Sequence, residues 1–132
     1  MNDEAAPRPP ITVRHDARGV ATVTLDRPQV HNAFDEHTIE ALSDAFLGLA
    51  DEAGTRVVVL RGNGPSFSSG GDANWMRRMA GAGLDTNRAD AARLALMLRR
   101  LAALPQPVVC CVHGNAFGGA LGLMSACDVV VA

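Results

Sequence analysis

Two glycine-rich segments, residues 61–72 and 113–119, are the parts of the sequence best suited to chemistry. Each follows an apolar run typical of a buried strand and precedes a run suited to a helix. Backbone N–H groups at a helix start lack an intrahelical partner, and the helix dipole favours negative charge there. Because glycine lets a ligand approach the backbone closely, each segment could hold an anionic oxygen without a charged side chain.

The repetition of this pattern predicts one site with two N–H donors. Taken singly, either loop could instead be a turn that needs a positive φ angle. A nucleotide-binding α/β protein is a further alternative. Neither loop ends in Gly-Lys-Ser/Thr, however, and no Gly-x-Gly-x-x-Gly follows a strand, so the nucleotide site ranks last.

The elements that must position these loops alternate between strand and helix, which predicts an α/β fold of repeated β-β-α units with mostly parallel pairing. A polar, proline-rich tail at residues 1–10 is expected to be disordered, and 11–132 to form the folded part. Strands are expected at 11–15, 20–25, 56–60, 107–112 and 129–131, with a hairpin turn at 16–19.

Helices are expected after the N-cap Asp35 to about residue 54, from 72 or 74 to 79, and at 87–104 and 119–126. Residues 80–85 are expected to form a flexible connector between the second and third helices. In the helix at 87–104, the core-facing side is expected to carry four residues: Ala91, Leu94, Leu98 and Leu101.

Composition excludes several classes of protein. A net charge of −2 and 4% aromatic residues give no basis for binding nucleic acid or an anionic membrane surface. No apolar run reaches transmembrane length, and the N-terminus lacks a signal-peptide pattern. Cys110, Cys111 and Cys127 lie in apolar segments without metal-ligand spacing, which predicts buried free thiols in a reducing compartment. We therefore expect a cytoplasmic protein without a metal.

Four motifs in order carry a family resemblance. They are residues 25–28 with 32–33, then 67–72, 113–119 and 127–128. With them, the chain resembles the enoyl-CoA hydratase/isomerase (crotonase) superfamily, in register from Val20 to Ala132. Trp75-Met76 and residues 117–123 are similar to the methylglutaconyl-CoA hydratase branch. The resemblance implies a crotonase (ClpP-like) fold. Because the chain stops in an apolar strand, we expect a fragment, truncated before the C-terminal part of that fold.

The resemblance implies an acyl-CoA thioester as partner, with its carbonyl between the backbone amides of two catalytic residues, Gly71 and Gly119. It also implies a substrate-binding set: Arg27, Ser69, Gly71, Asp72, Ala73, Gly118 and Gly119. Arg27 could instead be a solvated loop charge, and Asp72 is also suited to a helix N-cap. No metal or redox cofactor is implied, since coenzyme A is part of the substrate. A homo-oligomer, trimer or hexamer, is implied.

The sequence departs from the resemblance where hydratases carry a glutamate three residues after the second oxyanion glycine. Here that position is Gly122, and a second glutamate would lie beyond Ala132. His113 and Asp128 are expected to be structural rather than catalytic. The resemblance therefore leaves open an enoyl-CoA hydratase, an isomerase or thioester hydrolase of the same fold, and a non-catalytic acyl-CoA-binding fragment.

Overall fold

The computed structural model describes residues 8–132, which form one five-stranded sheet with helices packed on it. The elements are β1 (Ile11–His15), β2 (Val20–Leu25), η1 (Pro28–Val30), α1 (Glu36–Ala50), β3 (Val57–Gly62), α2 (Ala73–Gly81), α3 (Leu84–Ala102), β4 (Val108–Cys111), α4 (Gly119–Ala126) and β5 (Val129–Val131). The strand order is β1-β2-β3-β4-β5. The β1–β2 pair is antiparallel and the other pairs are parallel, which confirms the predicted architecture.

The hairpin at residues 16–19 has a local cause. Gly19 has φ +84°, and a Cβ on it would lie 2.8 Å from the Gly54 carbonyl oxygen. The Gly19 carbonyl in turn accepts from the Arg56 amide at 2.7 Å, so this turn also fixes the start of β3. The predicted turn is thus confirmed, and a glycine is required there because of both its φ angle and the neighbouring backbone.

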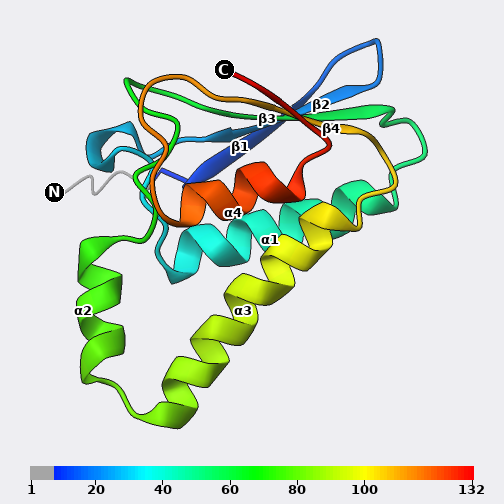
Figure 1. Cartoon of the computed structure of the whole chain (residues 1–132). Helices are drawn as coiled ribbons and strands as arrows, with labels where there is room; N and C mark the ends of the chain where they lie inside the picture. The colour runs from blue at the N-terminus through cyan, green and yellow to red at the C-terminus, as the bar shows by residue number, and fades with distance from the viewer. Residues whose placement is uncertain (1–7) are drawn as a thin grey trace, which may run out of the picture.

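The core lies between the sheet and three helical segments. Helices α1, α4 and the C-terminal half of α3 lie on one side of the sheet, whereas α2 and the N-terminal half of α3 extend away as an arm (Figure 1). Helix α1 begins at the N-cap Asp35, whose carboxylate accepts from the Thr38 amide. The largest fully buried side chains are Phe34, Phe46, Phe67, Leu25, Ile39, Leu42, Leu60, Met97, Leu101, Leu123, Val23 and Val58.

The arm corrects two predictions. The expected connector at 80–85 is wrong, since α2 runs to Gly81 and α3 begins at Leu84. The expected core side of the third helix is also partly wrong. Ala91 is exposed, and the buried residues of α3 are Met97 and Leu101. Leu94 and Leu98 are half-buried and pack against the edge of the core. Helical periodicity shows which side is apolar, but it does not show how far the helix extends past the sheet.

Two further expectations change in detail. Residues 1–7 of the predicted tail lie outside the described residues. Residues 8–10 are held by Asp26, which accepts from Arg8 at 2.8 Å and donates its amide to the Pro10 carbonyl at 2.8 Å. All three cysteines are free, but only Cys110 is buried, whereas Cys111 is exposed. Among residues 8–132, no helix is both long and apolar enough to cross a bilayer.

Candidate functional site

The two glycine loops meet along their backbones. The Phe67 amide donates to His113 at 2.9 Å, and the Ser68 amide donates to Asn115 at 3.2 Å. The Phe117 amide then returns a hydrogen bond to the Ser68 carbonyl at 3.1 Å. Ser68 and Ala116 thus form a short parallel bridge beyond the ends of β3 and β4. The two loops therefore lie side by side, as one site requires, and the joint binding of an oxygen by their amides stays a prediction.

Past this bridge, the two loops lie too close to leave room for a side chain at Gly70. Gly70 has φ +86°, and a Cβ on it would lie 2.7 Å from the Phe117 carbonyl oxygen and 3.1 Å from the Gly119 amide nitrogen. Gly118 also has a positive φ, +53°, and turns the chain into α4. Only glycine at position 70 satisfies both the φ angle and the contact. Gly71, the residue after Gly70, and Gly119 of the second loop therefore lie next to this contact.

The amides of these two residues are free. Three of the four adjacent amides are engaged: Gly70 donates to the Ser68 hydroxyl at 3.1 Å, Asp72 to Phe34 at 2.6 Å and Ala120 to Phe117 at 3.0 Å. Within residues 8–132, by contrast, the Gly71 and Gly119 amides donate to no protein acceptor, and neither does the Gly118 amide. Gly119 is the first residue of α4, so its N–H belongs to the unpaired helix start. The site thus offers unused amide donors from both loops, with Gly71 in the first and Gly118 and Gly119 in the second.

A third segment, at Phe34, packs against both loops. The Phe34 amide donates to Gly70 at 2.8 Å, and its carbonyl accepts from Asp72. The buried Phe34 ring lies under the second loop, where a Cβ on Gly119 would meet it at 3.1 Å. The sequence singled out Asn32-Ala33 beside this residue but not Phe34 itself. No local pattern indicates that an aromatic residue before a helix packs under a loop 85 positions later.

Asn32 joins the first motif to the first glycine loop. Its side-chain amide donates to Asn63, Ser66 and Phe67 carbonyl oxygens at 2.8, 3.0 and 3.1 Å. Its side-chain oxygen accepts from the Arg27 amide at 2.8 Å. Asn32 is 1% exposed and has φ +55°, a conformation that asparagine tolerates better than most residues. This structural role was missed by the sequence analysis, which quoted Asn32 only as part of a motif.

Arg27 is turned inward. Its guanidinium donates to the Ala33 carbonyl at 2.6 Å and lies 3.5 Å from a carboxylate oxygen of both Asp35 and Asp72. The side chain is 20% exposed, so the alternative of a solvated loop charge is wrong. Burial alone would raise the pKa of Asp35. Hydrogen bonds from the Thr38 amide and hydroxyl, together with Arg27, outweigh burial and lower that pKa below its ordinary value.

Asp72 caps the helix that follows the first loop. Its carboxylate accepts from the Asn74 amide at 2.9 Å and from the Trp75 amide at 3.1 Å, which confirms the N-cap interpretation. Because Arg27 lies between the caps of α1 and α2, one guanidinium ties together the starts of two helices. The first glycine loop ends at the start of α2, so the position of its last residue, Asp72, is fixed by these contacts.

Four predicted substrate-binding residues line a common cavity of about 330 Å³. Its lining residues are Val30, Ala33, Ser69, Gly71, Asp72, Ala73, Asn74 and Arg77. Arg27 lines a separate cavity of about 500 Å³ with Arg8 and Gln29. Gly118 and Gly119 line neither cavity and are exposed beside the first loop. Arg77 was missed by the sequence analysis, although a basic residue one turn into α2 could have suggested it.

Other polar candidates have structural partners. The His113 Nε2 lies 2.6 Å from the Gly64 carbonyl oxygen, and the Asp128 carboxylate accepts from the Val108 amide at 2.7 Å. Gly122 lies on α4, and a Cβ there would make ordinary contact with Leu98 at 3.5 Å. Across residues 8–132, no three His, Cys, Asp or Glu side chains gather in a way that could hold a metal ion.

Known proteins match most of this chain. A family model described as enoyl-CoA hydratase/isomerase matches residues 15–132. The chain is 35% identical over 112 residues to a Thermus thermophilus protein whose name proposes an enoyl-CoA hydratase, covering 85% of this chain and 44% of that protein.

Solved structures agree with this match. An enoyl-CoA hydratase from Shewanella pealeana superimposes with TM-score 0.89 at 37% identity, over 92% of this chain and 45% of that one. An enoyl-CoA hydratase from Mycobacterium smegmatis gives TM-score 0.87 at 36% identity, over 93% and 47% of the two chains. The chain therefore spans about half the length of the proteins it matches.

Proposed function

The chain belongs to the enoyl-CoA hydratase/isomerase (crotonase) family and has its fold, and we propose that its glycine loops bind the thioester carbonyl of an acyl-CoA between the amides of Gly71 and Gly119. The observation that carries this proposal is that these two amides have no protein acceptor although the two loops meet beside them, whereas the amides of Gly70, Asp72 and Ala120 are engaged. Ser69, Asp72 and Ala73, which share a cavity with Gly71, would lie along the coenzyme A.

Two N–H donors aimed at one oxygen suit a reaction in which that oxygen becomes negative. Removing the α proton of a thioester, or adding a nucleophile to its β carbon, moves charge onto the carbonyl oxygen as an enolate forms. Donors fixed by the backbone need no reorganisation when this charge appears, and each contributes about 3–4 kcal/mol to the transition state. The rigid supports described above, Asn32, Phe34 and Gly70, hold these donors in place.

The reaction we propose for the full-length protein is addition of water across the α,β double bond of an enoyl-CoA, of the methylglutaconyl-CoA type. The support for this finer substrate is the resemblance of residues 117–123. Neither loop supplies the general acid and base that hydration requires, and Gly122 stands where the resemblance implies a glutamate. Isomerisation and thioester hydrolysis share the same carbonyl stage and remain the alternative reactions. We propose that the full-length protein is a cytoplasmic homo-oligomer. The proposed reaction uses no metal or redox cofactor.

A non-catalytic acyl-CoA-binding protein is the second candidate, and Gly122 is the observation that favours it. An assay for hydration of short enoyl-CoA thioesters by the full-length gene product distinguishes the enzyme from the binding protein. The reaction is monitored as the loss of absorbance of the conjugated thioester. An enzyme hydrates the substrate, whereas a binding protein only retains it in equilibrium dialysis.

The role of the Gly119 amide is tested by two matched variants. Gly119→Pro removes the N–H, yet proline is well accepted at the first position of a helix. Gly119→Ala introduces the same Cβ, 3.1 Å from the Phe34 ring, and keeps the N–H. We expect turnover to fall about 100- to 1,000-fold in the proline variant and much less in the alanine variant. Near-normal turnover by a proline variant with an unchanged circular dichroism spectrum would contradict the proposal.

A further inference from the structure

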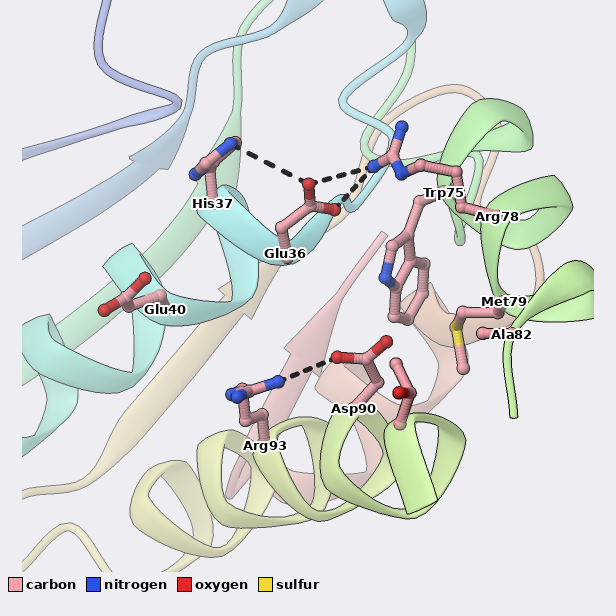
Figure 2. Close-up of a pocket in the computed structure, with 10 residues that line it drawn as sticks. Glu36, His37, Glu40, Trp75, Arg78, Met79, Ala82, Asp90 and Arg93 are labelled. Carbon is pink, nitrogen blue, oxygen red and sulfur yellow. Dashed lines mark hydrogen bonds and ion pairs between the residues drawn. The ribbon is translucent and has the colours of Figure 1, made fainter. Parts of the chain in front are cut away.

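A second cavity lies on the arm and adjoins the first glycine loop through Trp75, whose ring would lie 3.7 Å from a Cβ on Gly71. It has a volume of about 500 Å³ and is enclosed by the start of α1, by α2 and by the first turns of α3. Figure 2 shows the residues that line it: Glu36, His37, Glu40, Trp75, Arg78, Met79, Ala82, Thr86, Asp90 and Arg93. We call this cavity the arm cleft. It shares no lining residue with the cavity that contains Gly71.

The arm cleft contains a buried donor without an acceptor. Trp75 is 8% exposed and is the buried residue of α2. Its indole Nε1 is shielded from solvent and has no hydrogen-bond partner among the described residues. The ring edge that carries Nε1 faces the space between Glu36 and Asp90 (Figure 2). Buried polar groups are nearly always paired, so this donor calls for an acceptor that the described chain does not supply.

The walls of the arm cleft hold one carboxylate without a cationic partner. The Arg78 guanidinium binds Glu36 at 2.8 and 2.9 Å, and Arg93 binds Asp90 at 2.8 Å. Glu40, one turn after Glu36, is exposed and forms no ion pair with any residue from 8 to 132. It stands apart from these pairs in Figure 2. The cleft therefore combines a spare negative charge with a spare N–H donor.

We propose that the arm cleft binds a basic residue of an extended peptide, with its cationic side chain at Glu40 and a backbone carbonyl at the Trp75 Nε1. A peptide supplies both groups in one residue: the carbonyl is a strong acceptor, and the ammonium or guanidinium group matches Glu40. The indole also attracts a cation that passes over its face. Met79 and Ala82 offer apolar surface to the aliphatic stem.

Entry of the peptide requires a small widening around Trp75, because solvent does not reach Nε1. The arm is suited to this movement. Trp75 is the only buried residue of α2, and the buried residues of α3 lie in its C-terminal half, at Met97 and Leu101. A segment fixed by few buried contacts opens at low free-energy cost. The occupant thus satisfies Trp75 without disturbing the sheet.

The test uses the fact that Trp75 is the single tryptophan of the chain. Its indole N–H gives one resonance in a ¹H–¹⁵N correlation spectrum, which moves downfield when the donor gains an acceptor. The probe is acetyl-Ala-Lys-Ala-amide, titrated to millimolar concentration, and the matched control peptide carries norleucine in place of lysine. We expect a saturable downfield shift with the lysine peptide and binding at least threefold weaker with the norleucine peptide.

Variants complete the test. Glu40→Gln should weaken lysine-peptide binding about three- to fivefold, to the level of the norleucine peptide. Asp44→Asn lies on the same side of α1 one turn further on, outside the arm cleft, and should leave binding unchanged. An indole resonance that does not move would overturn the proposal. Equal binding of the two peptides, or equal binding by wild type and Glu40→Gln, would overturn it as well.

Discussion

The backbone of Gly70 lies against the amide of Gly119 with no room for a side chain between them. A Cβ on Gly70 would lie 3.1 Å from the Gly119 nitrogen and 2.7 Å from the Phe117 carbonyl oxygen. This contact sets the spacing of the two free amides, because Gly71 follows Gly70 directly and Gly119 is its neighbour in the other loop. The proposed carbonyl site therefore depends on a residue that donates nothing to it.

Gly70→Ala should separate the two loops. The variant places a side chain at a positive φ angle and against the Phe117 carbonyl oxygen. Because this oxygen belongs to the backbone, it cannot move aside as the end of a flexible side chain would. We expect the free energy of unfolding to fall by about 2–3 kcal/mol in urea denaturation, with acyl-CoA binding lost. Gly122→Ala is the matched control, since its Cβ makes ordinary contact at 3.5 Å and alanine favours a helix. Equal unfolding midpoints for Gly70→Ala and wild type would contradict the described contact.

Asn32→Ala should loosen the first glycine loop. Three carbonyl oxygens lose their donor, two of them in buried hydrogen bonds, and alanine is strained at the positive φ angle of this position. We expect a loss of about 3 kcal/mol in the free energy of unfolding, and faster hydrogen exchange of the loop amides. Asn74→Ala, at an exposed position on α2, should change stability by less than about 0.5 kcal/mol. Similar losses in both variants would show that Asn32 does not hold the loop.

Acid should weaken the tie between α1 and Arg27 in a predictable direction. The folded-state pKa of Asp35 lies below its ordinary value of 3.8, so the carboxylate stabilises the fold fully above that value. This contribution is lost as pH falls below 3.8 and through the folded-state pKa. Asp35→Asn keeps a good N-cap but removes the charge beside Arg27.

We therefore expect Asp35→Asn to be less stable than wild type at pH 7, with the difference shrinking as the pH is lowered below 3.8. Urea denaturation at a series of pH values measures it. A difference that stays constant down to pH 2.5 would mean that the Asp35 charge does not interact with its surroundings as described.

Local chemistry made the helix starts and turns predictable from sequence. Asp35 and Asp72 cap helices because their short carboxylates reach the first free amides, and the residues around them need not be known. Gly19 marks a hairpin for the same kind of reason. The repeated strand–loop–helix pattern is why one shared site was predictable, and in the structure the two loops follow adjacent parallel strands.

Contacts between distant segments could not be predicted in this way. The partners of Arg27 are two caps, 8 and 45 positions away, and its inward orientation depends on both being present. Phe34 supports loops that are distant in sequence. The exposed Ala91 was misplaced because its burial depends on where the arm leaves the sheet rather than on helical period. The missed features are thus the ones that tertiary packing decides.

The central claim is that the Gly71 and Gly119 amides polarise a thioester carbonyl, and infrared difference spectroscopy tests it most directly. Butyryl-CoA with and without ¹³C at the carbonyl isolates the stretching band of the bound thioester from the protein amide bands. We predict a band at lower frequency than for butyryl-CoA in water, which Gly119→Ala retains and Gly119→Pro moves back toward the solution value. A bound band at the solution frequency in the wild-type protein would contradict the account.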